Sequence, residues 1–146
     1  MDLSEVIERG SRAVAEHDSY GALKKSAELV LEAMSSYPDY GVIAASPAAE
    51  RVLGAVMMLS PDVTVGSARG VVIFDVNLAS GTVLARATDR LLRSGHEGTI
   101  VAVAIHTLTE QRPGSIEGAD QLLILDSSGS SDQTTKSSDH RLLVAL

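Results

Sequence analysis

The run Gly70-Val71-Val72-Ile73-Phe74-Asp75-Val76-Asn77-Leu78-Ala79-Ser80-Gly81-Thr82-Val83-Leu84 decides the fold of this chain. Its first half predicts an apolar strand over residues 71–76 that carries one acid, Asp75. Its second half is a loop of small residues that leads into a predicted helix over about residues 80–94. Such a strand, loop and helix place a carboxylate and several backbone N–H groups at one edge of a sheet. This edge predicts a binding site in which the acid holds a sugar hydroxyl and the loop holds a phosphate.

Apolar runs and helical patterns alternate on both sides of this segment. The residues before it predict helices over the first part of the chain, over about 20–36 and over 47–59, with strands at 41–45 and 63–65. The residues after it predict strands at 99–105, 122–125 and 141–146, and the Ser-, Asp- and Gly-rich residues 127–139 predict a mobile loop. In the helix over 80–94, Leu84, Ala87, Leu91 and Leu92 are predicted to face the sheet. We therefore expect a single α/β domain over residues 1–146, with a mainly parallel twisted sheet flanked by helices and an N-terminal helical part over residues 1–38.

Composition narrows the classes of function. The 146 residues fit one domain, and a 45% hydrophobic content with only 3% aromatic residues predicts an aliphatic core. The net charge of −7 disfavours non-specific binding to nucleic acid or anionic membranes. The absence of cysteine excludes disulfides and thiolate catalysis. The acidic N-terminus does not resemble a signal peptide, and no apolar run is long enough for a membrane span, so a cytoplasmic protein is expected.

Two loops are predicted to meet at the edge where ligands bind in open parallel sheets. One follows the strand at 41–45 and includes Ala45 and Ser46, with Pro47 at the start of a helix. The other runs from Asp75 to Val83, where Ser80 and Thr82 add hydroxyl groups to a helix N-terminus that favours anions.

The run from Val71 to Leu84 resembles the signature of the type I phosphoribosyltransferases, in which four apolar residues precede two acids, two apolar residues and a Thr-Thr-Gly-type phosphate loop. A weaker similarity extends over about residues 20–126. The resemblance implies a phosphoribosyltransferase-like fold in which Asp75, at the first acid, holds ribose hydroxyls. It also implies that the 5-phosphate binds the loop formed by Ala79, Ser80, Gly81, Thr82 and Val83, and that Ala45 and Ser46 line the pyrophosphate side. By their position in the sequence, Arg51 and Arg69 are the candidate cations for this side.

The chain departs from this signature at three places. Val76 stands at the second acid, Ala79 stands where some members carry a carboxylate base, and Ser60 to Gly70 is short for the flexible loop of the family. No metal ligand set is predicted, and Mg²⁺ is expected only if the chain is active, since one acid alone is a poor metal site. We expect binding of a small phosphorylated sugar or nucleotide, with phosphoribosyl transfer to a nitrogenous base as its chemistry. The alternative is a catalytically inactive regulatory or assembly module, and the apolar N-terminal helices are compatible with a homodimer.

Plainer interpretations remain open for each residue. Asp75 would then only cap the turn after its strand, the loop from Ala79 to Val83 would be an ordinary strand-to-helix turn, and Arg51 and Arg69 would be solvated surface residues. His106, just past a buried strand, is at the correct edge for chemistry but also fits a structural role. The sequence has no Gly-x-x-x-x-Gly-Lys, Gly-x-Gly-x-x-Gly or Gly-x-Ser-x-Gly motif, which disfavours nucleotide hydrolases, dinucleotide enzymes and serine hydrolases.

Overall fold

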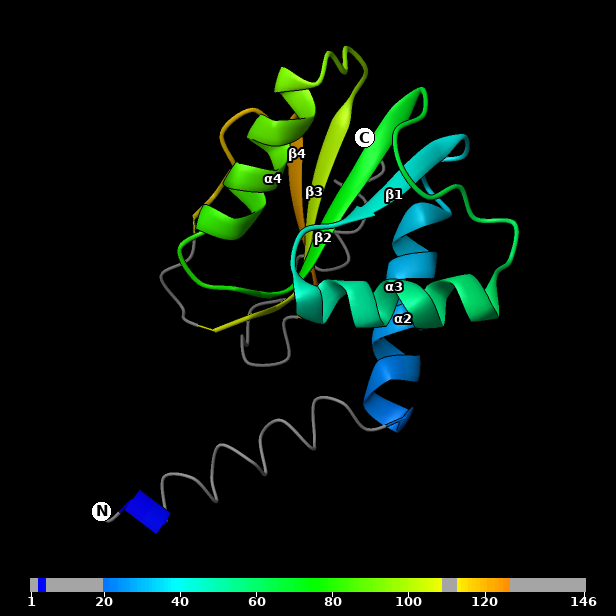
Figure 1. The fold of residues 1–146 in the computed structure, drawn as a ribbon, viewed down its shortest axis with the longest axis vertical. Helices are drawn as coiled ribbons and strands as arrows, with labels where there is room; N and C mark the ends of the chain where they lie inside the picture. Colours follow the sequence, from blue (N-terminus) through cyan, green and yellow to red (C-terminus); the bar gives the residue numbers. More distant parts are fainter. Residues whose placement is uncertain (1–2, 5–19, 109–112, 127–146) are drawn as a thin grey trace.

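The computed structural model describes residues 3–4, 20–108 and 113–126 (Figure 1). From residue 20 onward, the described part contains three helices and four strands. In chain order these are α2 (Tyr20–Met34), β1 (Tyr40–Ala44), α3 (Pro47–Leu59), β2 (Gly70–Leu78), α4 (Thr82–Arg93), β3 (Ile100–Thr107) and β4 (Gln121–Asp126).

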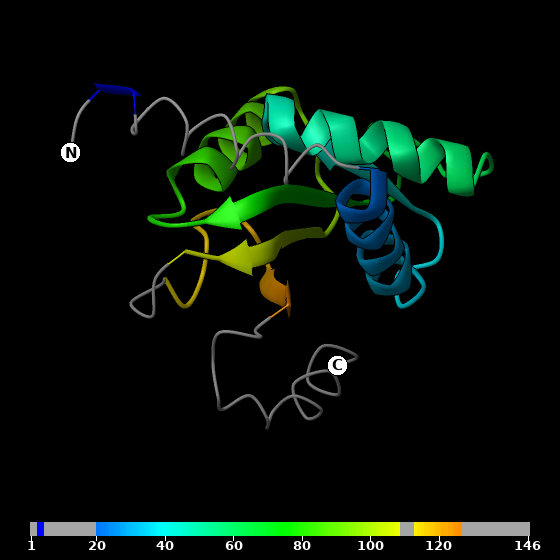
Figure 2. The same cartoon turned by 90° about the horizontal axis from the view of Figure 1, so that it is seen from below.

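All strand pairs in the sheet are parallel, and the strands lie side by side in the order β1-β2-β3-β4. The arrowheads of β2 and β3 point the same way in Figure 2. Residues 63–65 extend the sheet beyond β1 through a bridge between Val65 and Val42. In this bridge the N–H of Val42 donates to the carbonyl of Thr64 at 2.9 Å. The chain therefore leaves β1 in one direction, through α3 to this outer segment, and then fills the sheet in the other direction from β2 to β4.

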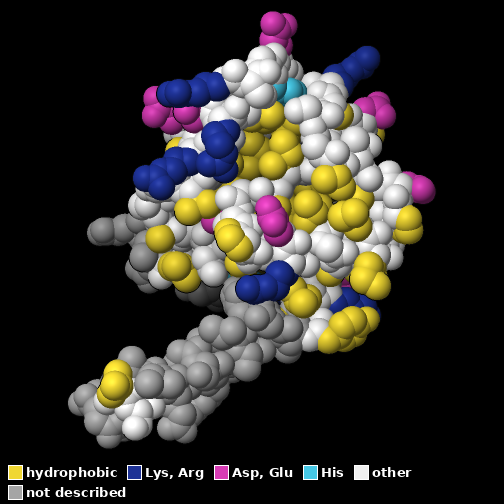
Figure 3. Space-filling view, viewed as in Figure 1, with side chains coloured by type: hydrophobic (Ala, Val, Ile, Leu, Met, Phe, Trp, Pro, Cys, Tyr) yellow, Lys and Arg dark blue, Asp and Glu magenta, His cyan; other side chains and the backbone are white. Residues whose placement is uncertain are grey.

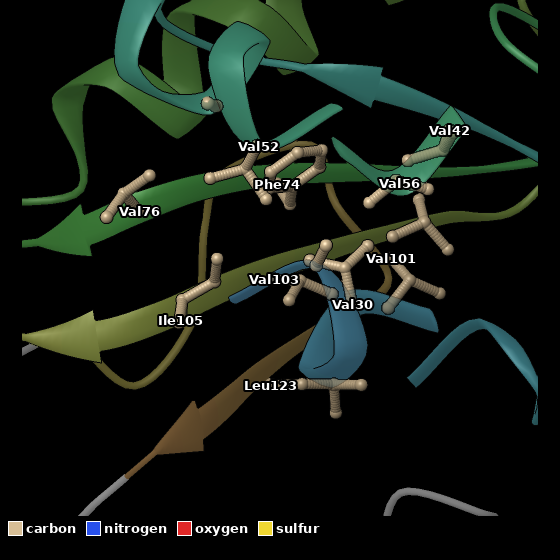
Figure 4. Close-up of a cluster of buried hydrophobic side chains, with 13 residues drawn as sticks. Val30, Val42, Val52, Val56, Phe74, Val76, Val101, Val103, Ile105 and Leu123 are labelled. Atoms are coloured by element: carbon tan, nitrogen blue, oxygen red, sulfur yellow. The ribbon is translucent and has the colours of Figure 1, made fainter. Parts of the chain in front are cut away.

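Helices cover both faces of the sheet. Helices α2 and α3 pack on one face, where alternate strand residues such as Phe74 and Val103 form a core with Val30, Val52 and Val56 (Figure 4). Helix α4 packs on the other face through Leu84, Ala87 and Leu91. Successive strand residues point to opposite faces, so β2 and β3 contribute to both cores and read as nearly continuous apolar runs.

The coarse prediction of an α/β fold with a parallel sheet is confirmed. The prediction that Leu92 on α4 faces the sheet was wrong, since its side chain is 43% exposed, and Met57 on α3, which was also expected to face inward, is 46% exposed. Strand β2 continues to Leu78, two residues past the predicted end. The predicted mobile loop at 127–139, the strand at 141–146 and most of the first helix lie outside the described residues.

Candidate functional site

The sheet changes its direction of growth between β1 and β2. The helix after β1 lies on one face and the helix after β2 lies on the other, so the two loops that follow these strands diverge from the same edge. In doubly wound sheets, this switch point at the carboxyl ends of the strands is where ligands bind. Both sequence-predicted loops, Ala45–Ser46 and the loop after Leu78, lie at this switch point.

Asp75 is tied to the start of α3 through Ser46. The hydroxyl of Ser46 donates to Oδ1 of Asp75 at 2.6 Å, and the N–H of Val76 donates to the same oxygen at 2.8 Å. Ser46 is also the N-cap of α3, because its Oγ accepts from the N–H of Ala49 at 3.1 Å. Asp75 is only 7% exposed, and no hydrogen bond to its Oδ2 is found in the described part of the chain. Oδ1 therefore ties the loop after β1 to strand β2, while Oδ2 makes no such contact within the described residues.

The loop before α4 is held in shape by a glycine. Gly81 has a φ of +88°, a left-handed conformation that glycine adopts without strain. A Cβ at this position would lie 3.0 Å from Cδ1 of Ile116 and 3.2 Å from Cγ of Pro113. Pro113 and Ile116 therefore pack against the predicted phosphate loop, and no local sequence pattern predicts this contact.

The exposed side of the same loop carries two hydroxyl groups. Oγ of Ser80 and Oγ1 of Thr82 are 2.8 Å apart and share a hydrogen bond, and the N–H of Thr82 donates to Oγ of Ser80 at 3.3 Å. Ala79, Ser80, Thr82 and Val83 are all exposed. Unlike α3, which Ser46 caps, α4 has Gly81 at its N-cap position and therefore has no side-chain cap. First-turn N–H groups have no intrahelical partner, so the start of α4 presents donors and a positive dipole end to solvent.

Two residues predicted for the pyrophosphate side lie at opposite edges of the sheet. Ala45 lies at the switch point, and its N–H donates to the carbonyl of Phe74 at 2.9 Å, so this N–H is engaged by the sheet. Arg69 directly precedes β2 and therefore lies at the amino-terminal edge of the sheet, where its carbonyl packs against Gly98. This edge is opposite to the one that carries Ser46.

The other arginines among the described residues lie on α3 and α4. Arg51 is an exposed residue of α3 and lines a pocket on the α2 side together with His106 from β3. Three arginines lie along α4, namely Arg86, Arg90 and Arg93. Figure 3 shows basic side chains gathered over this helix. Arg90 and Arg93 are in its last turn, where cations stabilise the negative end of the helix dipole.

The residue next to Asp75 on β2 is Val76, so this strand adds no second carboxylate beside Asp75. Val76 is 3% exposed and packs into the core on the α2 and α3 face, because neighbouring strand residues point to opposite faces. Among the described residues, no group of three His, Asp or Glu side chains is arranged to hold a metal ion.

No protein-family model, curated protein or solved structure matches this chain. In the described residues, no helix has the length and apolar character needed to cross a bilayer. The site and the fold together define the chain as a doubly wound α/β domain with a small-residue loop at its switch point.

Proposed function

We propose that this domain binds a phosphorylated sugar or a nucleotide at the loop from Asp75 to Val83, in the manner of a phosphoribosyltransferase-like protein. The observation that carries the proposal is the start of α4, which lacks a side-chain cap, follows exposed small residues and lies at the switch point. A phosphate there would accept hydrogen bonds from first-turn N–H groups and from the hydroxyls of Ser80 and Thr82. Oδ2 of Asp75 would accept from a ribose hydroxyl.

The same geometry favours binding over phosphoribosyl transfer. Val76 turns away from the site, so Asp75 would hold a substrate's Mg²⁺ without a neighbouring acid. The segment between α3 and β2 is also short and largely fixed, since the N–H of Val63 donates to the carbonyl of Ser60 at 3.0 Å and Val65 pairs with β1. This leaves little chain to close over a pyrophosphate. An inactive module that senses a nucleotide or sugar phosphate therefore fits the site better than a transferase.

Titration with ribose 5-phosphate, phosphoribosyl pyrophosphate and nucleoside monophosphates tests the proposal. A ligand that binds only the folded state raises the thermal midpoint, and calorimetry then gives its Kd. Thr82→Val removes one hydroxyl donor and should weaken binding about tenfold, the loss expected for a charge-assisted hydrogen bond. Ser67→Ala, an exposed serine in the turn before β2, is the matched control and should leave the Kd unchanged.

Asp75 requires a variant that separates its two roles. Asp75→Asn keeps an Oδ1 that accepts from Ser46 and Val76, so the free energy of unfolding should change by less than about 1 kcal/mol. Asp75→Ala removes that acceptor and should cost about 1–3 kcal/mol. If Asp75 also holds a sugar hydroxyl, Asp75→Asn weakens ribose 5-phosphate binding about tenfold while the fold stays intact. Equal affinity in Asp75→Asn would leave Asp75 with a capping role only, and no midpoint shift with any of the ligands at millimolar concentration would refute the binding function.

A further inference from the structure

A pocket of about 180 Å³ lies on the opposite side of the sheet edge from Asp75. Its walls come from α2, from the first turns of α3 and from the carboxyl ends of β2 and β3. In Figure 4, Val76 lies near the arrowhead of β2 and Val52 lies on α3 above the sheet. The candidate phosphate site does not share this pocket, because Val76 and Asp75 point to opposite faces.

The size and walls of the pocket limit its ligand to a small body with an apolar surface. Cavities of about 150 Å³ hold a single benzene ring, so this pocket has room for one ring or a branched chain of similar size. Six of the described lining residues are apolar: Ala22, Leu23, Leu29, Ala48, Val52 and Val76. A sugar phosphate, with hydroxyls on every carbon, would leave most of its polar groups unpaired against such walls.

The polar lining residues are cationic or hydrogen-bond donors. Lys25 on α2 and Arg51 on α3 are exposed and bring two positive charges to the rim. His106 and the nearly buried Ser26 add an imidazole N–H and a hydroxyl. No acidic residue is among the described residues that line the pocket, in a chain with a net charge of −7. Arg51 and His106 also interact with other parts of the protein, so a ligand would share these groups with their present neighbours.

We propose that this pocket binds a small organic carboxylate, whose single ring or branched chain contacts the apolar walls and whose carboxylate meets Lys25 and Arg51. The two oxygens of a carboxylate can accept from Lys25 and Arg51, whereas a phosphate dianion takes more donors than the rim supplies. The site is independent of the phosphate loop, and the domain would then hold two different ligands on the two sides of one sheet edge.

Benzoate is the probe, and benzamide is its neutral control of the same shape. In a ¹³C-methyl NMR titration of the whole chain, benzoate should shift the methyl signals of Val52 and Val76, and benzamide should bind about fivefold more weakly because it lacks the charge. Lys25→Gln should weaken benzoate binding by a similar factor. Lys24→Gln is the matched control, since Lys24 pairs with Glu28 on the same helix and does not line the pocket.

Ala48→Leu fills the pocket and should abolish the methyl shifts with benzoate. If this variant does not fold, Lys25→Gln still tests the proposal, because Lys25 is exposed and its replacement does not disturb the core. Absence of shifts at Val52 and Val76 at millimolar benzoate would overturn the proposal. Equal affinities for benzoate and benzamide would also overturn it, because the pocket would then be an apolar cavity without charge selectivity. Ribose 5-phosphate added to the benzoate complex should not change the methyl signals of Val52 and Val76. The two binding proposals can therefore be refuted independently of each other.

Discussion

Tyr37 shows how a single residue joins distant parts of the sheet. It lies just after α2, and its hydroxyl donates to Oε1 of Gln121 on β4 at 2.8 Å. Its ring also packs against Tyr40 at the start of β1, with ring centroids 5.1 Å apart. Burial, and then the neighbouring Tyr40, raise the pKa of Tyr37 above its ordinary value of 10.0. The folded state therefore holds the Tyr37 proton more tightly than the unfolded state does.

This pKa shift predicts a loss of stability at alkaline pH. Below the ordinary pKa of 10.0, the contribution of Tyr37 is fully present, and it is lost as the pH rises from there through the raised value, because the unfolded chain ionises first. Tyr37→Phe should cost about 0.5–1.5 kcal/mol at neutral pH, since one hydrogen bond is removed, and should show a smaller alkaline loss than the wild type. Urea unfolding over this pH range measures both effects. Tyr20→Phe, at a tyrosine that is 79% exposed, is the control, and the prediction fails if both variants have the same pH slope.

At the scale of the element, one crossing makes the switch point possible. After the outer segment at 63–65, the chain passes over β1 to begin β2, and the carbonyl of Gly66 lies directly against Gly41. A Cβ on Gly41 would overlap this carbonyl oxygen and would also lie 3.4 Å from Cβ of Ala68. A glycine in β1 is thus required by the close approach of another backbone.

Gly41→Ala should therefore destabilise the domain toward the upper end of the about 1–3 kcal/mol range for overpacking, because backbone rather than a mobile side chain must shift. Gly54→Ala is the matched substitution within α3, where a Cβ has no neighbour within 4 Å. It should instead stabilise the domain by about 1 kcal/mol through helix propensity. Chemical denaturation of both variants checks the opposite signs. A similar effect in both would show that the crossing does not constrain β1.

Local sequence patterns predicted the helices and strands of the described residues well. They did not predict contacts between residues that are far apart in the sequence. The bounds of α3 followed from Ser46 as a cap and Pro47 at the first helical position, and both are confirmed. The hydrogen bond between Ser46 and Asp75 joins residues 29 positions apart, so no local pattern encodes it. The wrong edge for Arg69 has a different cause: this residue precedes the strand predicted over 71–76, so the order along the chain already places it at the amino-terminal edge of a parallel sheet.

At the scale of the whole molecule, two cores share one sheet. The α2 and α3 face and the α4 face are separate apolar clusters, yet both include residues of β2 and β3. Strands β2 and β3 are buried on both faces, so unfolding of the helices on either face would expose their apolar side chains to water. The described domain is therefore expected to unfold in one cooperative transition, and a change in either core should be felt in the other.

Leu84→Ala tests this coupling. Leu84 is 1% exposed on the α4 face, so its truncation should cost about 2–5 kcal/mol. Tyr37 and Tyr40 pack against the core on the other face, and their fluorescence therefore reports the α2 and α3 side. Cooperative unfolding requires the denaturation midpoint measured by tyrosine fluorescence to fall by the same amount as the midpoint measured by circular dichroism.

A tyrosine midpoint that stayed at the wild-type value while the circular dichroism midpoint fell would show that the two faces unfold separately. The proposed phosphate loop at the start of α4 and the proposed carboxylate pocket beside α2 would then belong to different cooperative units. Coincident midpoints instead place both proposed sites in one cooperative unit. A ligand bound at either site would then raise the free energy of unfolding of the whole domain.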